Sequence, residues 1–407
     1  MEENEGDGGN NGTGEGRTIR SVAFAPTPPH VRNILAAASF DGSISIWEDF
    51  GDTAAASAAD NMADASSGST AATTADATAD ATTTSRGWEC TALLEGHDSE
   101  VKDVAWNSTG TLLASCGRDK SVWIWECFLA GTIGSDGTGG VGATHGTSGG
   151  GGEGDFECVA VLSQHSGDVK SVVFAPSHAI WGDGDDVLLS ASYDDTIKVW
   201  AEDAGDWYCA VTLQGVHTST IWSLGLYPGG VRMVSASADC SLAIWRCYTA
   251  MEKRDLLLLQ QQQEQEQEAT SDMKKDEKKL KLEFAGQGQD GMWKCVGTLP
   301  KAHENVIYSV DCAPARAGHG RIASAGADNA IHIYREVNEN GIGTAAAAAT
   351  TTTRTSSSSE APVFCLDASK EMAHDGDVNC IQWHPYNGAI LASAGDDGVI
   401  KIWNYSI

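Results

Sequence analysis

The chain has 407 residues, and its 56 acidic and 26 basic side chains give it a net charge of −30. A surface this acidic repels phosphate groups, which disfavours broad binding to nucleic acids and to anionic membranes. The sequence has no run of about 18 apolar residues that would span a membrane, and residues 1–16 lack the basic and apolar segments of a secretory signal. Eleven cysteines in such a chain indicate free thiols in a reducing compartment.

Six segments along the chain end in the same way, with an Asp six positions before a Trp or Tyr. In chain order they are SFDGSISIW (39–47), CGRDKSVWIW (116–125), ASYDDTIKVW (191–200), ASADCSLAIW (236–245), AGADNAIHIY (325–334) and AGDDGVIKIW (394–403). A unit that recurs in this way predicts a repeat architecture.

The second unit shows how one repeat is built. VKDVAW (101–106) alternates as a strand does, and LLASC (112–116) and SVWIW (121–125) follow across turns. A fourth strand carries an aromatic-x-Cys pattern, which recurs at 88–94, 156–162, 207–213 and 293–299 and more weakly at 363–367. Four short strands at a period of about 40 residues predict an all-β propeller with six readable blades.

A polar set of four residues recurs inside the unit: a His before the first strand, a Ser on the second, the turn Asp and the final Trp. The four complete sets are His97, Ser115, Asp119, Trp125; His165, Ser190, Asp194, Trp200; His217, Ser235, Asp239, Trp245; and His374, Ser393, Asp397, Trp403. Such groups can form a buried, satisfied hydrogen-bond network. Ser-His-Asp catalytic triads are the alternative, but catalysis needs one exposed set, whereas this set recurs from blade to blade.

The GH…D…W pattern resembles WD40 repeats, with Gly96-His97 as its intact dipeptide. The wording of CGRDKSVWIWE, ASYDDTIKVW, HSGDVKSVVF (165–174) and HDGDVNCIQWHP (374–385) is similar to one family, the WD40 protein of cytosolic iron–sulfur protein assembly. The resemblance covers all six repeats and none of the long segments between them. It implies a seven-bladed WD40 β-propeller.

Only six of those seven blades are readable, because the first unit of this chain resembles the family's second. Residues 1–16 are mainly Gly, Asn and Glu, which have too little apolar area to supply the missing blade. We therefore expect a truncated gene model rather than a six-bladed ring. The unpaired edges of units 20–94 and 374–403 then predict poor solubility.

We divide the chain into a disordered acidic segment, 1–16, and a propeller, 17–407. Four inserts of biased composition interrupt the propeller, and we expect them to be disordered: 49–86, 129–154, 248–291 and 339–361. Each follows a final Trp or Tyr and precedes the next aromatic-x-Cys strand. Because those connections share one face of a propeller, we expect partners to bind the opposite, uninterrupted face.

Two positions of each unit should lie at the central channel on that uninterrupted face: the second residue of the first strand and the residue before the turn Asp. The first series is Arg20, Lys102, Lys170, Trp222, Tyr308 and Asn379. Together the two series predict a partner-binding patch of basic and aromatic residues: Arg20, Phe40, Lys102, Arg118, Lys170, Tyr193 and Trp222. Arg, Tyr and Trp dominate protein–protein hot spots. The simpler alternative is that these are ordinary exposed strand ends.

No motif for cofactor or metal binding accompanies this patch. The eleven cysteines are spread over the blades without a C-x-x-C pair, whereas cluster sites bring thiolates close together. No P-loop, dinucleotide-binding glycine pattern or H-E-x-x-H occurs. We therefore expect no cofactor, no metal site and no enzymatic activity.

The resemblance implies a non-enzymatic scaffold that helps to deliver iron–sulfur clusters to cytosolic and nuclear apoproteins. Its implied partners are a small assembly protein with a reactive Cys, a HEAT-repeat adaptor and a hydrogenase-like cluster carrier. It also implies that the residue matching Arg118 has a functional role on the surface. The location that it implies is the cytoplasm, with the nucleus as an additional one. The alternatives are a WD40 adaptor of a ubiquitin ligase or chromatin complex and a propeller enzyme, since one fold serves many functions.

Overall fold

The structure is a computed structural model that describes residues 18–26, 33–50, 87–128, 155–175, 186–249, 252, 258, 291–314, 320–337 and 362–405. The described residues form six antiparallel sheets, which confirms the all-β WD40 propeller. The predicted segment 1–16 and most of the four predicted inserts lie outside these residues. At their margins, strands extend to Asp49 and Thr249 and begin again at Gly291.

Each sheet is one blade, with strands in sequence order from the channel outward. The first three blades are β1 (Ile19–Phe24), β2 (Ile34–Ser39), β3 (Ser43–Asp49), β4 (Trp88–Glu95); β5 (Val101–Trp106), β6 (Leu112–Gly117), β7 (Val122–Phe128), β8 (Asp155–Leu162); and β9 (Val169–Ala175), β10 (Val187–Ser192), β11 (Ile197–Asp203), β12 (Asp206–Leu213). The last three are β13 (Ile221–Leu226), β14 (Arg232–Ser237), β15 (Leu242–Thr249), β16 (Gly291–Thr298); β17 (Ile307–Cys312), β18 (Ile322–Gly326), β19 (Ile331–Val337), β20 (Val363–Lys370); and β21 (Val378–His384), β22 (Asn387–Gly395), β23 (Ile400–Asn404).

The turn Asp of each repeat builds the tight connection between the second and third strands. In the second blade, Asp119 Oδ1 accepts hydrogen bonds from the backbone N–H of Ser121 at 3.0 Å and from its hydroxyl at 2.7 Å. Lys120 between them has a φ of 69°, in the left-handed region that short turns require. The residue after the turn Asp has a positive φ in the other five blades too: Gly42, Asp195, Cys240, Asn329 and Gly398.

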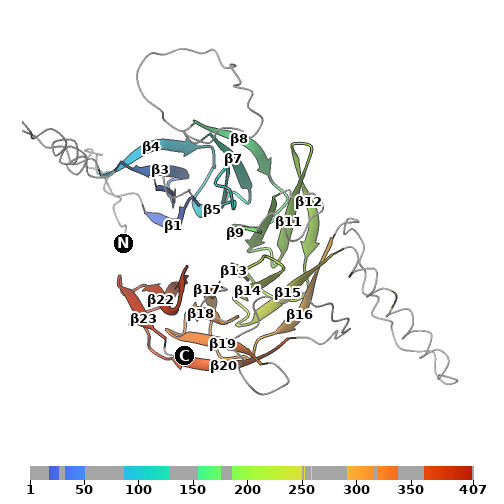
Figure 1. Ribbon diagram of the computed structural model, residues 1–407, viewed down its shortest axis with the longest axis vertical. Helices are drawn as coiled ribbons and strands as arrows, with labels where there is room; N and C mark the ends of the chain where they lie inside the picture. Colours follow the sequence, from blue (N-terminus) through green and yellow to red (C-terminus); the bar gives the residue numbers. More distant parts are fainter. Residues whose placement is uncertain are drawn as a thin grey trace, which may run out of the picture.

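The core lies between successive blades, whose inner strands pack in the order β1, β5, β9, β13, β17 and β21. At the joint of the second and third blades, Ile124 packs with Phe174 and Leu188 in one buried cluster. Successive side chains of a strand point to opposite faces of the sheet. Apolar residues on both faces suit this stacking, because a blade with a neighbour on each side is covered on both faces. Figure 1 shows the six sheets arranged around one axis.

Asp311 is a partly buried carboxylate at the joint between the last two blades. Its oxygens accept hydrogen bonds from the backbone N–H groups of Trp383 at 2.7 Å and Cys312 at 2.8 Å. Burial raises the pKa of Asp311 to about 7, against the effect of these two bonds. The folded state therefore holds the proton more tightly than the unfolded chain does.

We expect Asp311 to make the protein less stable as the pH rises. Its stabilising effect is complete below the unfolded pKa of 3.8 and is lost as the pH rises to about 7. Asp311→Asn removes the charge but keeps only one of the two acceptor oxygens, so the test is the pH dependence of its effect. The free energy of unfolding of the variant relative to the wild type should be about 2 kcal/mol higher at pH 8 than at pH 4, and urea unfolding at both pH values measures this. Asp206→Asn, at an exposed site, is the control, and an effect of Asp311→Asn that is the same at both pH values would contradict the assignment.

The ring of blades stays open between the first and the last blade. Among the described elements, each inner strand packs on the next, but β21 makes no comparable contact with β1. Val22 of β1 is 57% exposed, whereas Val104 at the same place in β5 is 4% exposed. Ile402 of β23 is 64% exposed, whereas Ile124 at the same place in β7 is fully buried. Two apolar blade faces, which elsewhere form the core, are therefore uncovered.

These uncovered faces should make the 407-residue chain associate in solution. We expect Val22→Lys combined with Ile402→Lys to lower concentration-dependent association in sedimentation and to leave the melting temperature unchanged. Val104→Lys is the control for the melting temperature. It places the same charge in a closed blade interface, so it should lower the free energy of unfolding by about 4 kcal/mol or more. A monodisperse, cooperatively melting wild-type chain would contradict this expectation.

Candidate functional site

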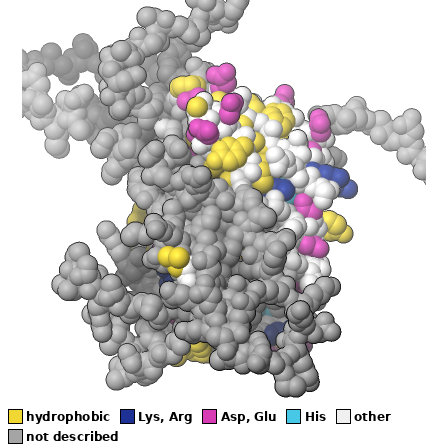
Figure 2. Space-filling view, turned by 90° about the vertical axis from the view of Figure 1, so that its right-hand side faces the viewer, with side chains coloured by type: hydrophobic (Ala, Val, Ile, Leu, Met, Phe, Trp, Pro, Cys, Tyr) yellow, Lys and Arg dark blue, Asp and Glu magenta, His cyan; other side chains and the backbone are white. Residues whose placement is uncertain are grey.

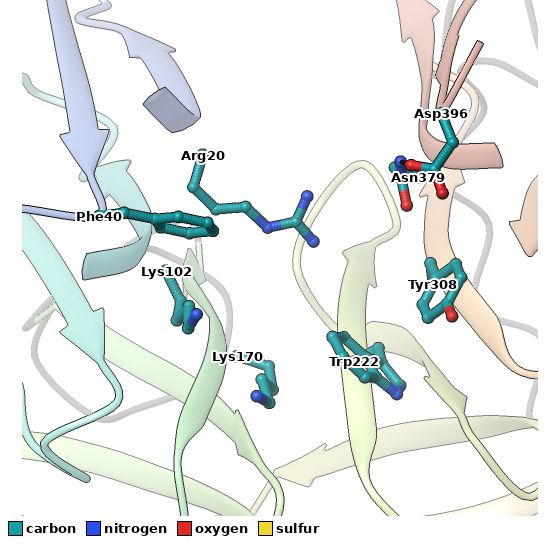
Figure 3. A pocket seen from close by; sticks show the side chains of 8 residues that line it. All are labelled: Arg20, Phe40, Lys102, Lys170, Trp222, Tyr308, Asn379 and Asp396. Atoms are coloured by element: carbon teal, nitrogen blue, oxygen red, sulfur yellow. Dashed lines mark hydrogen bonds between the residues drawn. The ribbon is translucent and has the colours of Figure 1, made fainter. Parts of the chain in front are cut away.

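Side chains from all six blades meet in one pocket at the channel mouth. The pocket has a volume of about 370 Å³, and eight residues line it: Arg20, Phe40, Lys102, Lys170, Trp222, Tyr308, Asn379 and Asp396. Six of them are the second residues of the six inner strands, and the other two precede a turn Asp. Figure 3 shows these side chains arranged around a common space, with the guanidinium of Arg20 reaching into it.

The two lysines of the pocket pack against aromatic rings. Lys102 Nζ lies 4.3 Å from the ring centroid of Phe40, and Lys170 Nζ lies 4.9 Å from that of Trp222. Each ammonium group also pairs with an acid two residues earlier, Lys102 with Glu100 at 2.6 Å and Lys170 with Asp168 at 3.1 Å. The cations are thus held in place at the mouth by ring faces and carboxylates.

Arg118 and Tyr193 belong to the predicted patch but do not line the pocket. Arg118 lies beside it, because its Nη1 contacts Glu100 Oε1 at 3.3 Å, and its side chain is 60% exposed. Tyr193 is likewise exposed, and Lys170 Nζ lies 5.9 Å from its ring centroid. The two residues therefore extend the pocket onto the surrounding surface.

Three lining residues were left out of the predicted patch. Tyr308 packs edge-on against Trp222 with ring centroids 5.1 Å apart, and Asn379 donates a hydrogen bond to Asp396. The repeat pattern could have identified all three as lining residues. Tyr308 and Asn379 continue the series of second residues of the inner strands, and Asp396 precedes a turn Asp. The choice of basic and aromatic types explains the omission of the amide and the acid but not that of Tyr308, whose position and type both matched the patch.

The recurring polar sets are hydrogen-bonded networks in the structure. In the four complete sets, His Nδ1 lies 2.7 to 3.1 Å from the Asp, and His Nε2 lies 2.6 to 2.8 Å from the Ser hydroxyl. The Trp indole donates to the same Ser oxygen at 2.8 to 3.0 Å. Burial alone would raise the pKa of Asp119, but hydrogen bonds from His97 and Ser121 outweigh it and lower the pKa to about 2.

Each of these four networks joins the His-containing loop of its blade to the turn and to the second and third strands. The four histidine side chains are completely buried, so no substrate reaches them. The fifth blade keeps His303, Ser324 and Asp328 but ends in Tyr334. In the first blade Trp47 donates instead to Ser45 at 2.9 Å.

All eleven cysteines are described, and all are free thiols. Four of those on outer strands, Cys90, Cys158, Cys209 and Cys295, donate to the carbonyl two residues later in their own strand. These four cysteines lie on β4, β8, β12 and β16, which belong to four different blades. In the blade interiors, burial raises the pKa of the Cys116 and Cys312 thiols well above the usual value, which keeps them protonated.

Acidic side chains are distributed over the described part of the side of the molecule in Figure 2. The mouth combines Arg20, Lys102 and Lys170 with one lining acid, Asp396, on a protein with a net charge of −30. In the part of the chain that the structure describes, no helix is long and apolar enough to cross a membrane.

Comparisons with known proteins agree with the repeat pattern. The model of the WD domain, G-beta repeat, matches residues 10–48, 88–126, 156–201, 207–246 and 362–404. Three relatives share the name "Probable cytosolic iron-sulfur protein assembly protein 1". The Chaetomium globosum protein is 34% identical (97% of this chain, 84% of the relative), the Candida albicans protein 33% (95% and 84%), and the Vanderwaltozyma polyspora protein 32% (96% and 82%). The chain therefore belongs to the WD40-repeat proteins and, within them, to the family of cytosolic iron–sulfur protein assembly protein 1.

Proposed function

We propose that this protein is a non-enzymatic scaffold of cytosolic iron–sulfur protein assembly, which helps to deliver clusters to cytosolic and nuclear apoproteins through protein contacts. Its relatives carry that assembly role in their name and align over nearly the whole chain. WD40 propellers typically serve as scaffolds that bind other proteins. The names of the relatives refer to cytosolic iron–sulfur protein assembly. We therefore propose that this protein is located in the cytoplasm and also in the nucleus.

The observation that carries the proposal for the binding site is the convergence of Arg20, Lys102 and Lys170 with aromatic rings in one pocket. A surface of this composition suits an acidic segment of a protein partner, because carboxylates pair with the cations and apolar groups cover the rings. The indole N–H of Trp222 has no hydrogen-bond partner among the described residues, so it is a donor that a bound partner or water can satisfy.

The pocket lies at the end of the blades that carries the β2–β3 and β22–β23 turns. The connections that include the predicted inserts leave from the opposite strand ends, after Asp49, Phe128, Thr249 and Val337. This arrangement supports a partner site on the uninterrupted face. From the family resemblance we propose three partners: a small assembly protein with a reactive Cys, a HEAT-repeat adaptor and a hydrogenase-like cluster carrier.

Charge reversal at Arg118 tests this surface. We expect Arg118→Glu to weaken binding of the assembly partners by roughly tenfold, because it places a carboxylate beside Glu100 at the rim of the pocket. The melting temperature should not change, since the side chain is mostly exposed. Binding by the purified chain, measured by calorimetry, and thermal melting are the two measurements.

Arg246→Glu is the matched control. Arg246 is 43% exposed and pairs with one carboxylate, Glu252, away from the mouth. Equal affinity of the Arg118→Glu and wild-type proteins would remove Arg118 from the site. Affinity purification that returns ubiquitin-ligase or histone partners, and no assembly proteins, would overturn the proposed function itself.

A further inference from the structure

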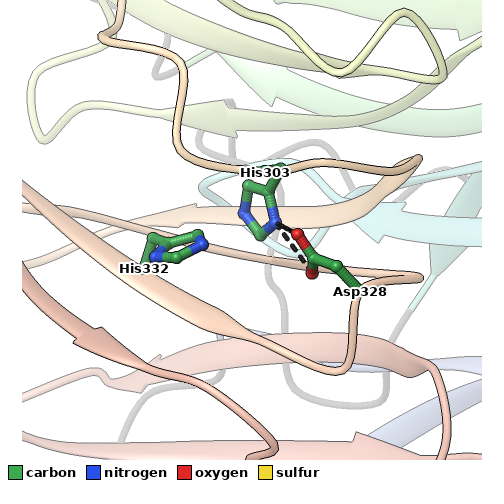
Figure 4. Close-up of side chains that lie close together, drawn as sticks. All are labelled: His303, Asp328 and His332. Carbon is green, nitrogen blue, oxygen red and sulfur yellow. Dashed lines mark hydrogen bonds and ion pairs between the residues drawn. The ribbon is translucent and has the colours of Figure 1, made fainter.

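The fifth blade differs from the others at one buried position on its third strand. His332 of β19 stands where the other blades have Ser45, Trp123, Lys198, Ala243 and Lys401. Its side chain lies beside His303 of the polar network, with ring centroids 4.3 Å apart. Figure 4 shows the two imidazoles and the carboxylate of Asp328 close together. Within the described residues, this cluster is the one group of three or more His, Cys, Asp or Glu side chains placed to hold a metal ion.

The three side chains are close enough together to bind one metal ion after a small movement of His332. One ligand atom each from His303, Asp328 and His332 lie within 4.8 Å of one another. His303 Nδ1 is 2.9 and 3.0 Å from the two Asp328 oxygens. In a tetrahedral zinc site, bonds of about 2.1 Å put neighbouring ligand atoms roughly 3.3 Å apart. A shift of up to about 1.5 Å at His332 therefore brings its ring nitrogen to that separation.

The hydrogen-bond partners of His303 also differ from those in the complete networks. In those networks the Trp indole can only donate to the Ser oxygen, which favours Ser donating to His Nε2 and leaves the His proton on Nδ1. In the fifth blade the partner of Ser324 is the hydroxyl of Tyr334, which can accept. Ser324 can then accept from His303 Nε2–H, at 2.7 Å, in the tautomer that frees the Nδ1 lone pair for an ion in place of the Nδ1–H···Asp328 hydrogen bond.

His332 itself is not satisfied by its surroundings. His332 is buried, with a relative exposure of 5%, and its Nδ1 has no hydrogen-bond partner among the described residues. A buried polar atom without a partner costs about 1–3 kcal/mol. An apolar residue, such as Ala243 of the fourth blade, has no such polar atom at this position. The imidazole therefore indicates a ligand that the described residues do not supply.

We propose that the fifth blade binds one divalent transition metal ion of the zinc type through His303 Nδ1, an Asp328 oxygen and a ring nitrogen of His332. Two imidazoles and a carboxylate form a recognised donor set for Zn²⁺, with water as the fourth ligand. Ser324 then serves as the outer hydrogen-bond partner that orients His303. Binding of the ion moves the His303 proton from Nδ1 to Nε2, so this histidine releases none.

The site is partly open to solvent at Asp328, and the charge of the protein attracts cations. A pocket of about 170 Å³ between the fourth and fifth blades is lined by Ala302, next to His303, and by Tyr334. The Asp328 side chain is 14% exposed, so one ligand is open to solvent. The net charge of −30 raises the local concentration of cations around the protein.

Metal binding by the full 407-residue chain, stripped with a chelator, tests the proposal. We expect one Zn²⁺ per chain in equilibrium dialysis, and Co²⁺ should give visible d–d bands without a thiolate-to-cobalt charge-transfer band. His332→Phe keeps an aromatic ring and should weaken Zn²⁺ binding by about 100-fold or more, beyond what loss of an outer-shell partner costs. His384→Phe, at an exposed histidine, should leave the affinity unchanged.

His332→Lys is the second variant, because the third and sixth blades have Lys at this position and fold with it. Both His332 variants should lose the rise in melting temperature that Zn²⁺ gives the wild-type chain. Equal Zn²⁺ affinity of the wild type and the His332 variants would overturn the proposal. The absence of binding by the wild type, or a thiolate charge-transfer band, would do the same.

Discussion

Replacing Ser190 by Ala should lower the free energy of unfolding by about 3 kcal/mol. Its hydroxyl lies 2.8 Å from both the His165 imidazole and the Trp200 indole, and all three groups are buried. The substitution leaves two buried polar groups without a partner, and each costs about 1–3 kcal/mol. Urea unfolding of the full chain, followed by tryptophan fluorescence, measures the change.

Ser166→Ala is the control for this experiment. Ser166 is an exposed serine beside His165 whose backbone N–H, rather than its hydroxyl, bonds to Asp194. Its loss should change the free energy of unfolding by less than about 0.5 kcal/mol. If Ser190→Ala destabilised no more than Ser166→Ala, the polar sets would not be the element that stabilises each blade.

Neutralising the two lysines of the channel mouth should reduce partner affinity by about 100-fold, because each charge paired across a desolvated contact contributes on the order of 2 kcal/mol or more. We choose Lys102→Gln with Lys170→Gln, since Glu at these places would face Glu100 and Asp168. Those acids are partly exposed, so losing their partners should cost the fold less than about 1 kcal/mol. Calorimetry with the assembly partners and thermal melting measure the two effects.

The control for the double variant is Lys294→Gln with Lys370→Gln, which removes the same charge from the outer strands β16 and β20. The control should bind as the wild type does. The affinity of the mouth variant should also depend less steeply on salt concentration, because fewer charge pairs form. A double variant that binds with unchanged affinity would show that partners use another surface.

The repeat pattern was sufficient to predict the blades and the members of each polar set. The spacing between the turn Asp and the final Trp is constant because both belong to one hairpin, so a local pattern reports a local structure. Asp119, for example, occupies a turn whose left-handed residue, Lys120, follows directly. The distance from a His to its Asp varies along the chain, but the four complete sets repeat the same order of residues.

The mouth of the channel was predictable by position but only partly by composition. The ring brings the second residue of every inner strand to one place, so Arg20 and Asn379 meet although they are far apart in sequence. Of the residues before the turn Asp, Phe40 and Asp396 line the pocket, whereas Arg118 pairs with Glu100 beside it. The order of residues in the repeat does not distinguish these cases.

Two further features were only partly or not at all predictable from the sequence. The missing blade predicted exposed edges on the first and last units, but Val22 and Ile402 are of the same residue types as their buried counterparts, so only packing identifies these side chains as uncovered. The cluster around His332 joins a loop, a turn and a strand of one blade, and its neighbours in sequence give no metal-binding spacing. In both cases the decisive property is what lies next to a side chain, which depends on the arrangement of the whole blade.

A complementation assay tests the central claim most directly. In yeast cells depleted of their own cytosolic iron–sulfur protein assembly protein 1, expression of this chain should restore the activity of cytosolic iron–sulfur enzymes. The Lys102→Gln, Lys170→Gln variant, present at the same level, should fail to restore it. A well-expressed wild-type chain that restores no activity, or a double variant that restores it fully, would contradict a scaffold that acts through the channel mouth.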